Sequence, residues 1–294
     1  MKEYCKIIDP HTHLWQISQG YYGWISAGKS ELLGDLAPLN RDYLPKHYLA
    51  DSRNFKLEKL IHIEAASAAY AREEVDWVAR LQSQHDIIGG IVAGVNLLDS
   101  EVEKDLAFYR DHFLVKGVRQ ILNWHADSKY RAAEEDLLDN PLWARNFAML
   151  GKYHLSFDMQ ICPSQMMQAY RLAQHHQDVA VIVNHGGMPI AKDYGIWQAG
   201  IRKLSECPNV TIKLSGFGML DHHWTKPSIK AAVYFIIEQF GTSRCMFASN
   251  FPVDKLYGSF EETMGSYFSL VSDFSSSEQE DLFFKTAKSS YKME

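Results

Sequence analysis

Eight short apolar runs recur along the chain, and segments of helical length separate most of them. The runs are Tyr4–His11, Leu57–Glu64, Ile87–Leu97, Val115–Leu122, His154–Ile161, Val179–His185, Val210–Gly216 and Arg244–Asn250. In the segment 70–85, for example, Val75, Val78 and Leu81 recur at helical spacing with charged residues between them. Strands that alternate with helices form parallel sheets, and eight of them over roughly 250 residues match a barrel. We therefore predict an α/β fold, a (β/α)8 TIM barrel.

The same pattern predicts the helices between the strands. They are Tyr70–His85, Asp99–His112, Pro141–Lys152, Ser164–His176, Trp197–Glu206, Ser228–Phe240 and Ser259–Leu270, with a terminal helix over Glu278–Lys288. No linker rich in Pro, Gly or Ser divides the chain, so we expect one domain over residues 1–294. The alternative is an open doubly wound sheet, but the G-x-G-x-x-G turn typical of dinucleotide-binding sheets does not follow the first strand.

One connection is far longer than the others. It is the segment 14–56, which is rich in aromatic residues: Trp15, Tyr21, Tyr22, Trp24, Tyr43, Tyr48 and Phe55. Loops of this length are uncommon in compact domains and are often functional. This one leaves the strand end at which barrel enzymes build their active sites. We expect it to form a lid or a pocket wall; the alternative is a structured insertion that only packs on the barrel rim.

Charge and composition limit the classes of partner. The formal net charge is -6 and no basic stripe stands out, which disfavours nucleic acid. The four cysteines form no C-x-x-C pair, as expected for reduced thiols in the cytosol. Neither a signal peptide nor an apolar stretch of about 18 residues is visible. We expect a cytoplasmic protein with a small-molecule substrate and no membrane partner; whether it forms a homo-oligomer stays open.

The first predicted strand runs into the sequence Asp9-Pro10-His11-Thr12-His13. Alternate residues of a strand point to one face, so the imidazoles of His11 and His13 point the same way. Their spacing along the strand is about 7 Å, from which both rings can converge on one metal ion, one water or one substrate oxygen.

Polar side chains also mark the ends of the later strands. In chain order they are Glu64, Arg119, His125, Asp158, Gln160, His185, Lys213, Ser215 and Asn250. A buried charge is costly unless it is paired, and a purely structural barrel would not need so many of them at its strand ends. The sequence therefore predicts a functional site at this end of the barrel. We expect His62 to face away from that site, outside the barrel.

With these residues in place, the chain resembles the amidohydrolase superfamily, in its amidohydrolase 2 branch. Within that branch it is most similar to the sugar-lactone and 2-pyrone-4,6-dicarboxylate lactonases. The resemblance rests on segments that follow the family order over almost the whole chain: Ile8–Trp15, Lys116–Arg119, Asn184–Pro189, Ile212–Gly216 and Arg244–Val253. It implies a distorted (β/α)8 barrel and hydrolysis of a cyclic ester or a similar carbonyl compound.

The resemblance also implies roles for single residues. Relatives place a water, sometimes bound to zinc, between paired histidines, a histidine after the sixth strand and an aspartate after the eighth. By position these are His11, His13, His185 and residue 250, and the three histidines would be the ligands if a metal is bound. Residue 250 is Asn250, whose neutral amide cannot act as a base near pH 7. We therefore expect Zn²⁺ to be weakly bound or absent. The base would be His185, His11 or His13, with Asp254 as an outside candidate.

The predicted reaction is the opening of a small polar or anionic lactone by histidine-assisted attack of water. The expected catalytic residues are His11, His13, His185 and Asn250, and the expected substrate-binding residues are Glu64, Arg119, His125, Gln160 and Lys213. The cation of Arg119 suits a substrate carboxylate or a developing oxyanion. Two alternatives stay open. One is a metal-dependent decarboxylase of an unsaturated or aromatic acid, and the other is a non-catalytic ligand-binding barrel.

Overall fold

The eight predicted strands form one parallel sheet in a computed structural model, which describes residues 5–293. The strands are β1 (Ile7–Thr12), β4 (Leu57–Ile63), β5 (Ile88–Gly94), β6 (Val115–Ile121), β7 (Ser156–Gln160), β8 (Val181–Val183), β9 (Val210–Leu214) and β10 (Cys245–Phe247). Neighbours in the sheet follow chain order. The predicted (β/α)8 barrel is therefore confirmed, although most strands are shorter than the apolar runs. The predicted start at Tyr4 lies outside the described residues.

The first and last strands meet just beyond β10, and this contact brings the barrel near closure. Thr12 forms a parallel bridge with Phe251, and the His13 amide donates to the Phe251 carbonyl over 2.8 Å. The Asn250 amide likewise donates to the His11 carbonyl over 2.9 Å. These bonds place the paired histidines beside Asn250, although the two segments are far apart in the sequence.

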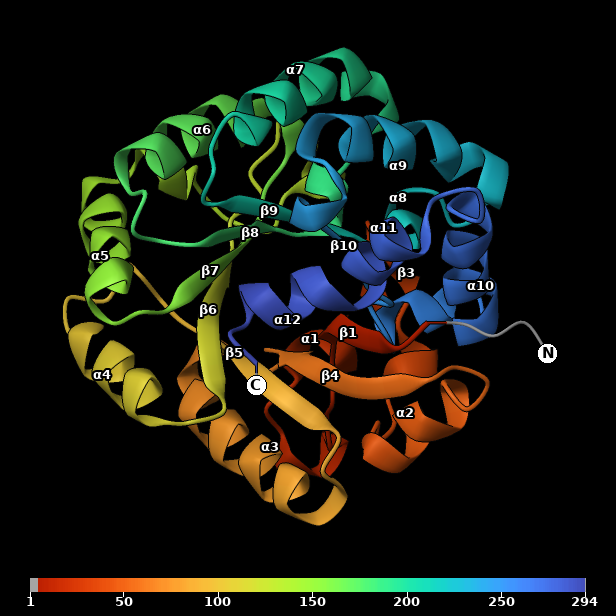
Figure 1. Cartoon of the computed structure of the whole chain (residues 1–294). Helices are drawn as coiled ribbons and strands as arrows, with labels where there is room; N and C mark the ends of the chain where they lie inside the picture. Colours follow the sequence, from red (N-terminus) through yellow and green to blue (C-terminus); the bar gives the residue numbers. More distant parts are fainter. Residues whose placement is uncertain (1–4, 294) are drawn as a thin grey trace.

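Helices surround the strands as an outer ring (Figure 1). They are α3 (Ala71–His85), α4 (Glu103–Asp111), α5 (Pro141–Lys152), α6 (Met166–His175), α7 (Tyr194–Ser205), α9 (Lys226–Phe240) and α10 (Phe260–Leu270), with a short α8 (Phe217–Leu220) after β9. These positions match the predicted helices closely. Within residues 5–293, no helix combines the length and apolarity needed to cross a bilayer.

Alternation along the strands sorts side chains between two cores. One face of each strand packs against the helices in a large apolar cluster. The other face lines the barrel interior, where a smaller cluster joins Ile8, Ile61, Val92, Ile182 and Met246. By the same period of two, Arg119, Asp158 and Lys213 point inward with this second set.

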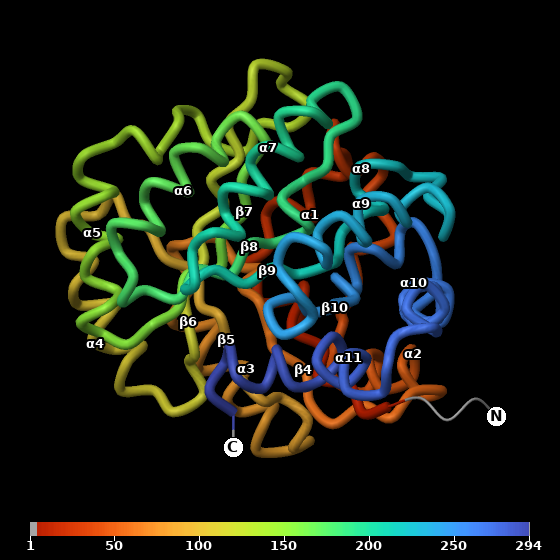
Figure 2. The backbone as a smooth tube through the Cα atoms, turned by 45° about the horizontal axis from the view of Figure 1, so that its top comes forward, coloured from red at the N-terminus to blue at the C-terminus, as the bar shows by residue number. Residues whose placement is uncertain are grey.

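The C-terminal segment covers the N-terminal end of the barrel. It comprises α11 (Ser276–Glu280), a π-helical turn (Asp281–Lys285) and α12 (Thr286–Ser290), where one helix was predicted. Ala287 and Tyr291 belong to the interior cluster, and Lys292 reaches the carbonyl of His154 just before β7. Figure 2 shows this segment at the bottom of the view, below β8, β9 and β10.

The segment 14–56 is a structured insertion rather than an open loop. It contains α1 (Gly23–Ser26), β2 (Lys29–Ser30), β3 (Gly34–Asp35) and α2 (Pro45–Asp51), with 3-10 turns at Ile17–Gln19 and Ala37–Leu39. Trp15, Tyr22, Tyr43 and Tyr48 are buried. Burial of these aromatic rings explains why so long a connection is ordered. The insertion also helps to wall a cavity of about 160 Å³ with the loop that follows Asn250; its predicted role as a lid stays a prediction.

Candidate active site

Three histidines meet at the C-terminal end of the barrel. His11 lies in β1, His13 follows directly after it, and His185 follows β8. The ring centroid of His11 lies 5.1 Å from that of His13 and 4.5 Å from that of His185. All three are buried. The structure thus brings together the three histidines that the sequence singled out.

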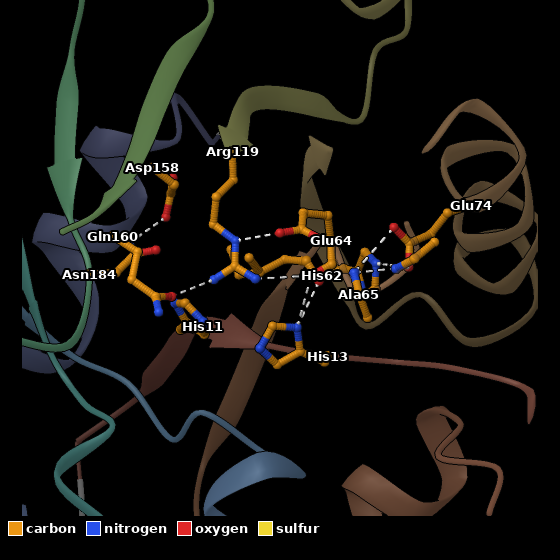
Figure 3. Close-up of polar contacts among 12 residues, drawn as sticks. His11, His13, His62, Glu64, Ala65, Glu74, Arg119, Asp158, Gln160 and Asn184 are labelled. Carbon is orange, nitrogen blue, oxygen red and sulfur yellow. Dashed lines mark hydrogen bonds and ion pairs between the residues drawn. The ribbon is translucent and has the colours of Figure 1, made fainter. Parts of the chain in front are cut away.

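The bonds at Nδ1 fix how His13 can act. Its Nδ1 lies 3.0 Å from the carbonyl oxygen of Ile63 and 3.2 Å from that of Glu64. Carbonyl oxygens only accept, so Nδ1 carries the proton and, in the neutral ring, Nε2 carries the lone pair. Figure 3 shows both contacts between the ring and the end of β4. His13 is therefore held as a proton acceptor at Nε2.

His11 is arranged in the opposite way. Its Nδ1 lies 3.3 Å from the ammonium nitrogen of Lys213, which is a donor when charged. The neutral ring then carries its proton on Nε2, an atom that is buried and has no hydrogen-bond partner among the described residues. This leaves His11 with a donor that is free to contact a ligand. His185 instead pairs its Nδ1 with the hydroxyl of Ser215 over 3.0 Å.

Burial and neighbouring cations keep the histidine rings neutral. Burial lowers the pKa of His11 well below its usual value, and the charge of Lys213 adds to the effect. Burial, followed by the charge of Arg119, similarly lowers the pKa of His13 and of His185. A neutral imidazole can accept a proton, whereas an imidazolium cannot.

Arg119 is held between two side chains at the wall of the site. Its Nε donates to Oε1 of Glu64 over 2.8 Å, and a terminal nitrogen donates to Oε1 of Gln160 over 3.3 Å. Its other terminal nitrogen donates to the Glu64 carbonyl, as drawn in Figure 3. Burial raises the pKa of the Glu64 carboxyl to about 7, although Arg119 opposes this shift. A guanidinium has five N–H groups, so two remain for a ligand.

Lys213 lies inside the barrel, with its ammonium nitrogen 3.3 Å from Nδ1 of His11. Its ammonium pairs with Asp158, whose carboxylate also accepts hydrogen bonds from Asn184 over 2.9 Å and from the Tyr291 hydroxyl over 3.0 Å. Burial lowers the pKa of Lys213 to about 8, and Asp158 opposes the shift. The predicted cation at this position is therefore part of a buried network that reaches the C-terminal segment.

Asn250 is bonded to an acidic residue one turn further on. Its side-chain nitrogen donates to Oδ1 of Asp254 over 2.8 Å, and both side chains are buried. Burial raises the pKa of Asp254 to about 7, and the hydrogen bonds from Asn250 and from the Gly216 backbone lower it. The outside candidate for the base thus contacts the site through Asn250.

His125 and His62 lie apart from the histidine cluster. The Nε2 of His125 lies 3.0 Å from Asp193, and its Nδ1 accepts from the Asp127 amide over 3.0 Å. Both ring nitrogens are therefore engaged: Nε2 joins the loops after β6 and β8, and Nδ1 bonds within the loop after β6, so substrate binding by His125 stays a prediction. His62 accepts from the Leu14 amide and faces Glu74 of α3, as Figure 3 shows, which confirms that it points away from the site.

The residues of this site do not complete a zinc centre. Among residues 5–293, no group of three or more His, Cys, Asp or Glu side chains has an arrangement suited to a metal ion. Asn250 contributes no negative charge, and the ammonium of Lys213 lies beside His11. Catalytic zinc sites combine three protein ligands with an open position, and the positive charge of Lys213 beside His11 opposes the binding of a second cation there.

Sequence reasoning missed Tyr291 and the partnership of Asn250 with Asp254. Tyr291 is separated from Asp158 by 133 positions, and its polar sequence neighbours Ser290 and Lys292 give no sign that it is buried. Asn250 and Asp254 are four positions apart, so a helical turn after the last strand would have suggested their contact.

Comparisons with known proteins bear on the family and the fold of the chain. The family model described as amidohydrolase matches residues 8–292. An uncharacterized protein of Sinorhizobium fredii, y4mH, is 34% identical over 98% of both chains. L-fucono-1,5-lactonase of Burkholderia multivorans is 27% identical over 87% of this chain and 85% of its own. A solved amidohydrolase from Burkholderia multivorans with bound Zn has a TM-score of 0.83 at 24% identity, covering 99% of this chain and 100% of that one, which supports the fold.

Proposed function

Because the chain belongs to the amidohydrolase family, we propose that it hydrolyses a small polar or anionic lactone with water as the nucleophile. The proposal rests on one observation: the neighbouring rings of His13 and His11 carry their protons on opposite nitrogens. His13 presents a lone pair at Nε2, whereas His11 presents a proton at Nε2. An acceptor and a donor side by side suit the activation of water and the polarisation of a carbonyl.

His13 is the base in this reaction. Its Nε2 takes a proton from water as the water oxygen bonds to the lactone carbonyl carbon. His11, with the charge of Lys213 behind its ring, donates to the carbonyl oxygen as that oxygen becomes negative. One such donor is typically worth about 3–4 kcal/mol in the transition state. The ring C–O bond then breaks, and the proton on His13 passes to the departing alkoxide oxygen.

The substrate class follows from charge and from similarity. Arg119 retains two free N–H groups at the wall of the site, which suit a carboxylate or a hydroxyl-rich ring. The similarity to a Burkholderia protein named L-fucono-1,5-lactonase supports a sugar lactone. Sugar lactones are therefore the first substrates to test, and dicarboxylate lactones are the second.

A pH-indicator assay of the purified protein tests the proposal, because the acid product ionises and releases a proton at neutral pH. We expect turnover of at least one lactone. His13→Gln should lower kcat by about 100-fold or more, in the range of general-base contributions. His175→Gln, an exposed histidine on α6, is the matched control and should retain full activity. Treatment with a chelator should leave the rate unchanged.

The same samples separate the two alternatives. Release of CO₂ in place of a ring-opened acid would support the decarboxylase. Thermal stabilisation by a lactone without any turnover would support a ligand-binding barrel.

A further inference from the structure

Asn250 is held at a defined place by its backbone. It is the third residue after β10 and adopts a left-handed conformation with φ of 57°. Its amide donates to the carbonyl of His11 over 2.9 Å, and its carbonyl accepts from the amide of Asp254 over 3.0 Å. The backbone therefore fixes where the Asn250 side chain starts, but it does not determine which end of the amide faces the histidines.

Asp254 determines which end of the Asn250 amide faces the histidines. An ionised carboxylate only accepts hydrogen bonds, so the atom of Asn250 that faces Asp254 must be the amide nitrogen. The amide oxygen of Asn250 therefore points away from Asp254, toward His13, which Asn250 also contacts. Without a carboxylate at position 254, the two orientations of the amide would differ little in energy, because both ends can hydrogen-bond.

Asp254 is itself fixed by the loop after β9. The Gly216 backbone hydrogen-bonds its carboxylate. Gly216 also lies against the ring of His185, since a Cβ added there would fall 2.5 Å from Nδ1 of that ring. The carboxylate thus sits at the junction of the loops that carry Asn250 and the Gly216–His185 contact.

We propose that Asp254 is a positioning residue that orients the amide of Asn250 with its oxygen toward His13. This inference rests on the proposed function and deepens it, because it explains how the site works without a carboxylate at position 250. Once His13 has taken the proton from water, the oxygen of Asn250 accepts from its Nε2–H until that proton passes to the departing alkoxide. The negative charge of Asp254 stabilises that imidazolium through one intervening amide. With the amide reversed, two N–H groups would face each other and proton uptake would be opposed.

An exchange of the two side chains tests the proposal with the full-length protein at about pH 8. Asp254→Asn should lower kcat by about 10-fold or more with KM within twofold, because the amide loses its fixed orientation. It should also move the acidic limb of the pH–rate profile. Asn250→Asp alone places two carboxylates in contact and should also be impaired. The double variant Asn250→Asp/Asp254→Asn keeps the hydrogen bond and places the charge beside His13, so it should recover activity to within about fivefold of the original chain.

Two results of this exchange would overturn the proposal. One is an Asp254→Asn variant with kcat within twofold and an unmoved pH profile. The other is a double variant no better than Asp254→Asn, which would mean that Asp254 acts in its own right. Asp51→Asn is the matched control, because Asp51 binds Lys255, the residue next to Asp254, from the insertion. Its kcat should not change.

A measurement without substrate keeps this inference separate from the lactonase proposal. In 1H–15N NMR spectra, the side-chain amide of Asn250 should exchange slowly with solvent and lose that protection in Asp254→Asn, while the fold is checked by the backbone amides. An unchanged Asn250 side-chain signal in this variant would overturn the positioning role. A protein that shows the protected amide but opens no lactone would instead refute only the proposed function.

Discussion

At the scale of single residues, hydrogen bonds on the far side of each ring decide what the near side can do. His13 and His11 are chemically identical, and both are buried in the same cluster. The carbonyl oxygens behind His13 make it an acceptor, whereas the ammonium behind His11 makes it a donor. The sequence places both rings in the site but does not assign these roles, because the partners come from β4 and β9.

Gly216→Ala is expected to disturb the site through His185. The new methyl group would lie 2.5 Å from Nδ1 of His185, at a residue with φ of 68°. We expect a loss of about 1–2 kcal/mol in unfolding free energy from the left-handed backbone and a loss of at least about 10-fold in kcat/KM from the displaced ring. Gly20→Ala is the control, since Gly20 has φ of 77° with open space around it. Equal activities of the two variants would contradict the contact.

Glu64→Gln should change how stability depends on pH. Burial raises the pKa of Glu64 from 4.5 to about 7 in the folded protein. Between these values the folded state binds more protons than the unfolded state, so this group makes unfolding easier as the pH rises. The stability of the original chain relative to Glu64→Gln should therefore fall across this window and level off above it. Urea unfolding at several pH values measures the difference; a rise would contradict the assigned shift.

At the scale of elements, the strands were predictable and the insertion was not. Parallel strands buried on both faces read as continuous apolar runs, so β4, β6 and β9 begin where their runs begin. The elements of the insertion are too short for any periodic signal, since α1 has four residues and β2 and β3 have two each. Its aromatic content indicated burial but not the folded path that achieves it.

The contribution of the C-terminal segment to stability depends on the hydroxyl of Tyr291. Tyr291→Phe removes the hydrogen bond to the Asp158 carboxylate inside the barrel. Because that acceptor is charged and buried, we expect a loss of about 1.5–3 kcal/mol in unfolding free energy. Tyr234→Phe is the comparison, since its hydroxyl bonds a carbonyl on the partly exposed outer ring and should cost about 1 kcal/mol. Urea denaturation measures the loss of unfolding free energy in both variants. A larger loss in Tyr234→Phe than in Tyr291→Phe would contradict this expectation.

At the scale of the whole molecule, the candidate site is assembled from strands spread over almost the entire chain. β1 provides His11, β6 provides Arg119, β9 provides Lys213, and the turn after β10 provides Asn250. The order of strands was readable from the sequence, and it predicted which side chains share one end of the barrel. The pairing of Asp158 with Tyr291 was not readable, because it requires the C-terminal segment to lie under the barrel.

Deletion of residues 276–294 is expected to prevent formation of the native barrel. It would remove Ala287 and Tyr291 from the interior cluster and expose Ile8, Ile61 and Met246 at the N-terminal end. Buried apolar side chains of this size contribute about 1.5–3 kcal/mol each. We expect binding of a hydrophobic dye and loss of the near-ultraviolet circular dichroism signal. A truncated protein with a cooperative unfolding transition would contradict this expectation.

The bridge between Thr12 and Phe251 has a consequence for synthesis in the cell. β1 emerges from the ribosome first, and its partner on one side, β4, follows soon after. The partner on its other side is made only after β10. At about 5–20 residues per second, the edge that carries His11 stays open for at least several seconds in every nascent chain. An open strand edge is a template for wrong pairing, so this edge of a growing chain needs protection until the segment after β10 has been made.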